Sequence, residues 1–266
     1  TQKSQKELSS MLKSRGYLSP HYQCFISSRS GGPTKLEHAE ENSQRTRSFV
    51  FLVLGAIMAR RAGHGQLIYL AENGQMAIHL PLTHGRVGAF STHTAHPEVL
   101  TSIKEFITNA LNVEFNIINP YVHRTKKEVI EVVFRHLPES IPISNSCWKN
   151  SRLPAGITHC GTCIPCFIRR IAIESLTTDT TKYHRNPWIE NVAALPPDDD
   201  ARRNLADLTE LIKRFELYND ETILSEWPEL YSPTINESEV ISMYRRFARE
   251  ARTVLGRYPM LSPFLS

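Results

Sequence analysis

Residues 146–172 read SCWKNSRLPAGITHCGTCIPCFIRRIA, and this stretch contains four of the five cysteines of the chain. The cysteines are spaced C-x12-C-x2-C-x2-C. Three thiolates so close in sequence can surround one side of a tetrahedral ion, and a fourth from upstream closes the shell, which is typical of a structural site. The spacing therefore predicts one structural zinc ion held by Cys147, Cys160, Cys163 and Cys166.

A redox pair is the alternative interpretation of the same cysteines. Cys160 and Cys163, or Cys163 and Cys166, have the C-x-x-C spacing of thiol oxidoreductases. Such a pair would leave Cys147 without a role, and the two overlapping pairs would compete, so zinc is favoured. The fifth cysteine, Cys24, has apolar neighbours and is expected to be a small core residue. His159 is expected near the metal shell or at the surface.

Upstream of the cysteines, residues 43–137 alternate between helical and strand patterns. Ser43 is a plausible N-cap for a helix to about Arg61, with Phe49, Leu52, Val53, Ala56 and Ile57 on one face. A strand is expected over 66–71, a helix from Pro97 to about Asn112 and a strand over 114–118. Thr125 and Glu128 form a capping box for a helix whose buried face carries Val129, Val132, Val133 and Leu137. This alternation predicts an α/β fold with a parallel sheet.

The remaining segments complete the expected organisation. A helix is predicted over 3–15 and a strand over 21–28, whereas 81–96 has no periodicity and is expected to be a long, functional loop. After Leu195 the chain is expected to be helical, with Leu205, Leu208, Ile212 and Phe215 buried and a last helix over 238–256. The predicted domains are an α/β domain over 1–140, a zinc segment over 141–177 and a helical region over 178–266.

Composition and charge narrow the class of protein. The 266 residues are 41% apolar and 22% charged, as in ordinary soluble globular proteins. The net charge of +4 is compatible with an anionic ligand such as a nucleotide but is far from that of a nucleic-acid-binding tail. The most apolar run, Phe49–Met58, is too short to span a membrane, and no signal peptide is expected from the first residues. A cytoplasmic location and no membrane partner are therefore expected.

The cysteine stretch resembles the zinc motif of the 7-cyano-7-deazaguanine synthase (QueC) family. That motif has the form S-C-[YW], a variable insert, and H-C-G-x-C-x-x-C-x-x-R-[RK]-x-A, and the chain matches its cysteines, Gly161, Arg169 and Ala172 in register. Residues 43–49 (SQRTRSF), 72–74 (ENG) and 119–128 (NPYVHRTKKE) resemble further family segments. With 91–97 (STHTAHP), they are most similar to the QatC-type branch of bacterial defence operons.

The resemblance implies a PP-loop ATPase-like, Rossmann-type fold and a ligase activity. In such enzymes ATP, with Mg²⁺, adenylates the carboxylate of a 7-deazaguanine, and ammonia then attacks during queuosine-type biosynthesis. In anti-phage relatives the acceptor is expected to be a protein amine, and a homodimer is a further expectation. The resemblance covers about residues 40–175.

The ATP-binding loop of that family, S-G-G-x-D-S, has no counterpart here. Ser30-Gly31-Gly32 follows the first expected strand but lacks the aspartate and the second serine, and it lies too close to the Ser43 helix. Because the loop strand is central to a doubly wound sheet, the chain is expected to be the C-terminal part of a longer protein. Its first residue, Thr1, agrees with that expectation.

Residues that would bind substrate or nucleotide come from five segments. Glu72 and Asn73 follow a strand, where α/β folds bind ligands. Arginines near a helix N-terminus suit anionic ligands, and a turn or solvent exposure is the ordinary alternative for each position. The candidates are Arg45, Arg47, Glu72, Asn73, Arg86, Thr92, His93, Lys126 and Arg169. Catalytic residues are not assigned.

Two other functions remain open at this point. A zinc-containing nucleic-acid-binding module is compatible with the basic charge, but basic and aromatic residues are not interleaved around the cysteines. A catalytically inactive QueC-like scaffold is equally compatible with the zinc motif.

Overall fold

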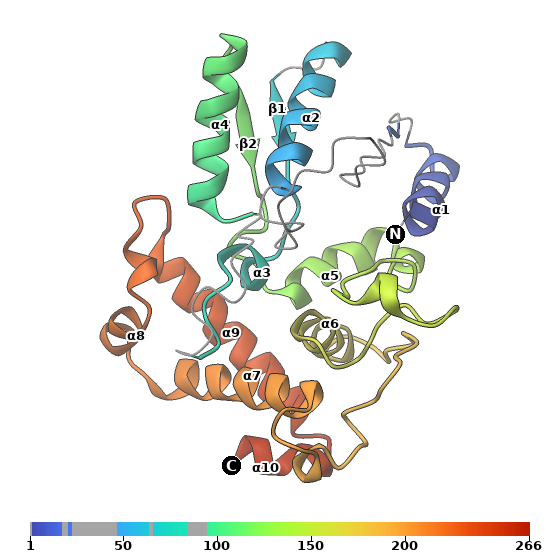
Figure 1. The fold of residues 1–266 in the computed structure, drawn as a ribbon, viewed down its shortest axis with the longest axis vertical. Coiled ribbons are helices and arrows are strands. Elements are labelled where there is room, and N and C mark those ends of the chain that lie inside the picture. Colours follow the sequence, from blue (N-terminus) through green and yellow to red (C-terminus); the bar gives the residue numbers. More distant parts are fainter. Residues whose placement is uncertain (1, 18–20, 23–46, 64–65, 84–94) are drawn as a thin grey trace, which may run out of the picture.

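The computed structural model describes residues 2–17, 21–22, 47–63, 66–83 and 95–266, and it is rich in helices (Figure 1). Two strands form a small parallel sheet. The elements are α1 (Gln2–Ser14), α2 (Arg47–Ala62), β1 (Leu67–Tyr69), α3 (Gly74–Ile78), α4 (Pro97–Leu111), β2 (Asn116–Ile118), α5 (Lys126–His136), α6 (Ile164–Glu174), α7 (Asp200–Leu217), α8 (Asp220–Glu226), α9 (Glu237–Leu255) and α10 (Ser262–Leu265).

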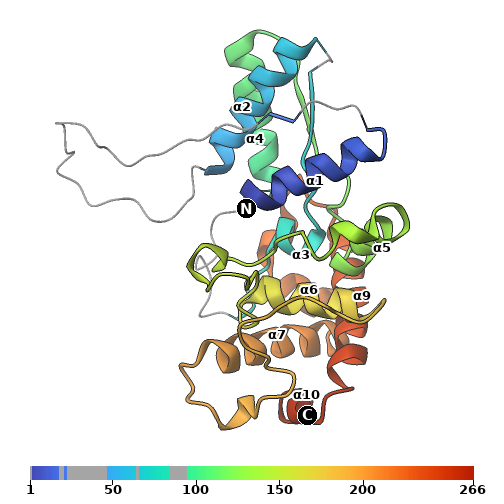
Figure 2. The same cartoon turned by 90° about the vertical axis from the view of Figure 1, so that its right-hand side faces the viewer.

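The α/β part of the chain confirms the predicted parallel pairing. Leu67, Ile68 and Tyr69 pair with Asn116, Ile117 and Ile118 in register. Helices α2 and α4 lie on the same side of the strands (Figure 2). Their buried residues enclose a small core with Phe115, consisting of Leu52, Ala56, Leu100, Ile103 and Ile107. A Rossmann-type sheet of more strands stays a prediction.

The opposite face of the sheet carries exposed apolar side chains. Tyr69 is 66% exposed, and Leu67 and Ile118 are also exposed. The alternation of exposed and partly buried residues along both strands follows the two-residue repeat of a β-strand. Only one face of this sheet is therefore covered by the described residues.

Helix α2 corrects one prediction about burial. Leu52 and Ala56 are buried as expected, but Phe49 and Ile57 are exposed. The helix is apolar on most of its circumference, so the sequence could not distinguish the face that packs on the sheet from the outer face. Phe49 instead contacts Phe106 of α4 with the two rings tilted by 59° and their centroids 5.2 Å apart.

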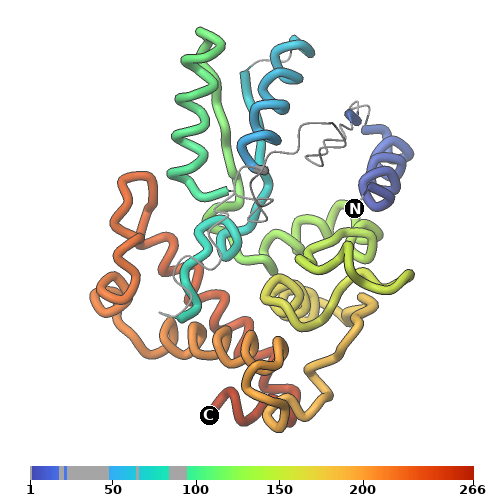
Figure 3. The backbone as a smooth tube through the Cα atoms, in the orientation of Figure 1, coloured from blue at the N-terminus to red at the C-terminus, as the bar shows by residue number. Residues whose placement is uncertain are grey.

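After β1 the chain does not form the predicted turn over residues 72–74: Asn73 is an extended N-cap, and Gly74 begins α3, a helix that the sequence did not predict. Ile78, Leu80 and Leu82 bury their side chains among the C-terminal helices rather than in the α/β part. The tube in Figure 3 shows this segment descending towards α7 and α9. The segment 74–82 therefore connects the two cores of the molecule.

The C-terminal helices surround the larger core. Leu205, Leu208, Ile212 and Phe215 of α7 are buried as predicted, and they pack with α6 and α9. On α5 the buried residue is Ile130, which contacts Ala172 and Ile173 of α6, whereas Val132 is exposed. The prediction that Val132 is buried was wrong, because the α6 contact lies on the adjacent side of the helix.

Several predictions fall outside the described residues. These are the core position of Cys24, residues 23–28 of the strand predicted over 21–28, the N-cap at Ser43, and residues 84–94 of the loop predicted over 81–96; residues 21–22 are described and are not part of a strand. Among the described residues, no helix is both long enough and apolar enough to cross a bilayer.

Candidate metal centre and the adjoining polar cluster

The four predicted cysteines come from a loop, a tight turn and the start of a helix. Cys147 precedes a short 3-10 turn, while Cys163 is the N-cap residue of α6 and Cys166 lies in its first turn, beside Pro165. Between Cys160 and Cys163 the chain turns at Gly161, whose φ is +80°. A Cβ at Gly161 would overlap the carbonyl oxygen of Arg185, so only glycine fits this turn.

The four sulfur atoms gather into one cluster. All four lie within 4.8 Å of one another. The Sγ atoms of Cys163 and Cys166 are 3.3 Å apart, and those of Cys160 and Cys166 are 3.9 Å apart. Tetrahedral zinc with bonds of ~2.3 Å needs sulfurs about 3.8 Å apart, so small adjustments would fit the ion. Cys147 is half-buried and the other three are buried.

Backbone and side-chain donors surround the sulfurs. Lys149 N and Cys160 N each donate to Cys147 Sγ at 3.3 Å, and Thr162 N donates to Cys160 Sγ at 3.4 Å. Hydrogen bonds among the thiols, that with Cys147 first, lower the pKa of Cys160 and raise those of Cys163 and Cys166. One thiolate therefore opposes the ionisation of its neighbours, and a bound cation would reverse that effect.

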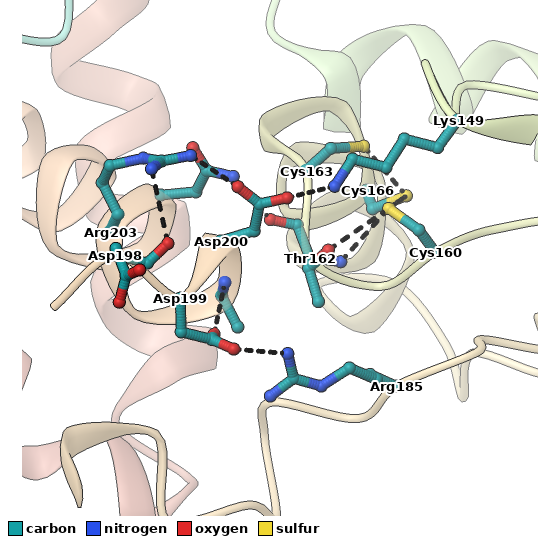
Figure 4. A network of polar contacts seen from close by, with 12 residues as sticks. Lys149, Cys160, Thr162, Cys163, Cys166, Arg185, Asp198, Asp199, Asp200 and Arg203 are labelled. Carbon is teal, nitrogen blue, oxygen red and sulfur yellow. Dashed lines mark hydrogen bonds and ion pairs between the residues drawn. The ribbon is translucent and has the colours of Figure 1, made fainter. Parts of the chain in front are cut away.

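Cations near the cluster are already paired with carboxylates (Figure 4). The Lys149 ammonium contacts Asp200, and this hydrogen bond raises the pKa of Lys149. Arg185 forms ion pairs with Glu190 and with Asp199, the latter at 2.9 Å. These pairs tie the cysteine segment to the start of α7 and leave little free positive charge beside the sulfurs.

The arrangement can hold a metal ion. It uses all four cysteines, including Cys147, which would have no role in a redox pair. Cys147 contributes its sulfur to the same cluster as the C-x-x-C pairs, and the four thiols are free of disulfides. A closed set of four sulfurs leaves no position for water or substrate, which fits a structural centre. The cluster itself is thus confirmed, and zinc as its occupant stays a prediction.

His159 lies beside the cluster and is completely buried. Its Nε2 accepts a hydrogen bond from Ser146 N at 3.2 Å, and its Nδ1 pairs with Thr158 Oγ1. Burial, with a smaller effect of Arg169, lowers the pKa of His159 to about 4. The imidazole is therefore neutral and holds the loop before Cys147, so the alternative of surface exposure was wrong.

Glu72 and Asn73 follow β1, at the end where parallel strands present ligand sites. Asn119, just after β2, exchanges two hydrogen bonds with the Glu72 backbone. Glu72 Oε1 accepts from the backbone N and from Nδ2 of Asn73. Among the described residues, Glu72 Oε2 accepts no hydrogen bond, and the buried Asn73 Oδ1 has no donor. Two acceptors are thus available at this point.

Lys126 is the first residue of α5 and enters the same region. Its backbone N donates to Gln75 Oε1 at 3.0 Å. Burial lowers the pKa of the Lys126 ammonium, Glu72 acts in the opposite direction, and Arg169 lowers it further. No described residue forms a hydrogen bond or ion pair with its Nζ. The side chain is therefore a desolvated cation near one carboxylate and one guanidinium.

Arg169 connects this polar cluster to the metal lobe. It is 1% exposed and donates to Ile141 O at 2.6 Å, to Ser144 Oγ at 2.8 Å and to Thr181 Oγ1. None of its described bonds goes to a cysteine sulfur, and no described residue accepts a hydrogen bond from its Nε. Lys126 and Arg169 lie one turn before Ile130 and Ile173, through which α5 and α6 pack.

The structure thus brings together Glu72, Asn73, Lys126 and Arg169 from the predicted set. Arg47 is the first residue of α2, and Arg45, Arg86, Thr92 and His93 lie outside the described residues. Gln75 was not among the predicted residues, although it is 4% exposed and accepts a hydrogen bond from Lys126 N. Its position directly after Glu72-Asn73-Gly74 was the available signal, but a glutamine after a predicted turn gives no indication of burial.

Comparison of this chain with models of protein families, with curated proteins and with solved structures found no match.

Proposed function

We propose that the chain is the acid-binding and metal-containing part of a QueC-like, ATP-dependent ligase. Such an enzyme adenylates the carboxylate of a 7-deazaguanine and transfers the acyl group to an amine. The observation that carries the proposal is the position of Lys126 at the start of α5, where its backbone is bonded to Gln75 of the segment that follows β1 and its ammonium group interacts with the charges of Glu72 and Arg169. The four-cysteine cluster and its motif support the same assignment.

The polar cluster suits both ends of such a substrate. Lys126 would meet the carboxylate, because an ammonium group that no described residue pairs with gains most from an anion. Glu72 Oε2 and Asn73 Oδ1 would accept the N–H donors of a guanine-type edge. Arg169 adds positive potential from the metal lobe, and its own bonds fix the loop around Ser144.

The ligase reaction divides the roles between this chain and an ATP site. The substrate carboxylate oxygen attacks the α-phosphorus of ATP, pyrophosphate leaves, and an amine then displaces AMP to form the amide. The sequence contains no S-G-G-x-D-S, so another segment or chain would bind the pyrophosphate and Mg²⁺. The residues described here would bind and orient the acid.

Binding of the 7-deazaguanine carboxylate to the chain tests the proposal by calorimetry. Lys126→Met keeps the apolar stem and removes the charge, so affinity should fall at least about tenfold. Lys127→Met is the matched control, because Lys127 pairs with Glu131 on the surface, and it should bind as the wild type does. Equal affinity of the Lys126 variant would contradict the assignment.

Product analysis tests the reaction class in the complete enzyme. Incubation with ATP and the acid should release AMP and pyrophosphate. Release of ADP, or release of AMP that does not depend on the acid, would exclude the adenylating ligase.

A nucleic-acid-binding module is less well supported, because Lys149 and Arg185 beside the cysteines are neutralised by carboxylates.

A further inference from the structure

Gln75 provides a hydrogen bond that the geometry of α5 cannot supply. The first N–H groups of a helix have no acceptor within the helix. Thr125 Oγ1 satisfies Glu128 N, and Gln75 Oε1 satisfies Lys126 N at 3.0 Å. A buried side chain of α3 thus fixes the backbone of the residue whose ammonium group enters the polar cluster.

A second contact holds α3 against the start of α5. Gly74 N donates to Arg124 O at 2.8 Å. A Cβ at Gly74 would overlap Val122 O, so α3 can approach this segment only with glycine at that position. The close packing of the α3 backbone therefore fixes the position from which the Gln75 side chain reaches Lys126 N.

The other end of the Gln75 amide has no described partner. Because Oε1 accepts from a backbone N–H, the orientation of the amide is fixed and Nε2 is the free end. Gln75 also lines a cavity of about 20 Å³ between α3, α6, α7 and α9, where His79 and Tyr244 are the other polar residues. A cavity of this size holds about one water molecule.

We propose that Gln75 positions Lys126, and that one buried water in this cavity accepts from Gln75 Nε2 and holds the amide in place. The importance of Lys126 rests on the proposed function, whereas the hydrogen bond and the water do not. Gln75 would act through Lys126 and would not itself contact substrate. The water would connect the start of α5 with Tyr244 on α9, whose hydroxyl accepts from Leu80 N.

Amide hydrogen exchange at Lys126 tests the hydrogen bond without any ligand. In Gln75→Met, which keeps the side-chain length but removes the acceptor, exchange at Lys126 should rise at least about tenfold. In Gln75→Glu a carboxylate oxygen replaces Oε1, and protection at Lys126 should persist. Amides of Val133 and Phe247 report whether each variant is folded. Unchanged exchange in folded Gln75→Met, or lost protection in folded Gln75→Glu, would overturn the assignment.

The pH dependence of Lys126 acylation provides a second readout, which would not change if Gln75 had a purely structural role. Acylation by an amine-reactive ester is followed against pH by peptide mapping, with Lys127 as the internal reference. In Gln75→Met the midpoint for Lys126 should move upward, because the side chain leaves its desolvated position. An unmoved midpoint would contradict positioning by Gln75.

A crystal structure tests the proposed water. It should show one water molecule bonded to Gln75 Nε2, and a cavity without water would refute the proposal that a water holds the amide. These outcomes do not depend on whether the chain binds a deazaguanine.

Discussion

At the residue scale, Cys147 separates the two interpretations of the cysteine stretch. It is 13 positions upstream of Cys160, and yet its sulfur accepts a hydrogen bond from the backbone of Cys160. A redox C-x-x-C pair does not need a third or fourth sulfur, whereas a tetrahedral metal site needs both. The position of Cys147 therefore favours a metal centre.

Metal analysis tests this residue assignment. The purified protein should contain one zinc ion per chain, and replacing any of Cys147, Cys160, Cys163 or Cys166 by serine should remove it. Loss of the ion should destabilise the fold by ~3 kcal/mol or more, because structural zinc binding is folding energy. Cys24→Ser is the control and should keep its zinc. A full zinc content after Cys163→Ser would show that the cluster does not bind as a four-sulfur site.

Two glycines with similar backbone angles allow a second test at this scale. Gly161 and Gly156 have φ values of +80° and +83°, but only Gly161 has atoms where a Cβ would lie. Gly156→Ala should cost about 1 kcal/mol from backbone strain alone. Gly161→Ala should cost at least ~3 kcal/mol, since it also displaces the Arg185 backbone. Chemical denaturation of both variants measures the difference, and equal costs would contradict the close packing at Gly161.

The separate residues were predictable to different degrees. The cysteine spacing defines its own chemistry, so the cluster could be inferred without a structure. The environment of Lys126 could not be inferred, because Gln75 and Arg169, which act on it, are distant in sequence. Gln75 was missed for the same reason, since its partner lies 51 positions away.

At the element scale, the start of α5 is fixed to α9 by Thr125. Its hydroxyl accepts from Glu128 N in the predicted capping box and donates to Glu250 Oε1 at 3.0 Å. Glu128 also receives the Arg246 guanidinium at 2.7 Å. Helix α9 thus holds the N-terminus of α5 at two points, beside the residue that enters the polar cluster.

Glu250 should make stability depend on pH. Burial raises its pKa to about 7 from the ordinary value of 4.5, with the Thr125 hydroxyl acting in the opposite direction. Because the folded pKa exceeds the unfolded one, stability is present below pH 4.5 and is lost as pH rises towards 7. Glu250→Gln should remove this loss and stabilise the protein by roughly 2–3 kcal/mol at pH 8.

Urea denaturation at pH 5 and pH 8 measures this effect. The advantage of Glu250→Gln should be small at pH 5 and large at pH 8. Glu237→Gln changes an exposed carboxylate of the same helix and should have nearly the same effect at both pH values. A constant advantage across the range would show that Glu250 ionises normally in the folded protein.

Local sequence patterns predicted the elements whose signals are complete within one segment. The Thr125 capping box, Pro97 at the start of α4 and the spacing of Leu205 and Leu208 were all confirmed. Helix α3 was missed because it has only five residues and is stabilised by contacts with α9. The outer face of α2 was misjudged because an apolar helix does not indicate which side is covered.

At the scale of the whole molecule, the two largest apolar cores of the described residues are unequal in size. The core between α2, α4 and the strands contains six buried residues, whereas the core around α6, α7 and α9 contains twenty-nine. Buried apolar area is the main source of stability, so the smaller core has less to resist opening.

Hydrogen exchange should therefore resolve two levels of protection. Amides of α2, β1 and β2 should exchange at least about tenfold faster than those of α7 and α9 under native conditions. The experiment compares peptide-level exchange across the chain at several times. Uniform protection would show that both cores open in one step and would contradict the unequal stability.

The crossing of segment 74–82 from one core to the other has a consequence for dissecting the protein. A fragment that stops near residue 140 would contain Ile78, Leu80 and Leu82 but none of the C-terminal helices that cover them. The complementary fragment would have a gap where those side chains belong. Neither fragment should fold when it is expressed alone. Mixing the two fragments should restore the folded structure, as in fragment complementation. A chimeric protein that receives the α/β part of a related protein would therefore also need the α9 residues that pack against segment 74–82 in that relative.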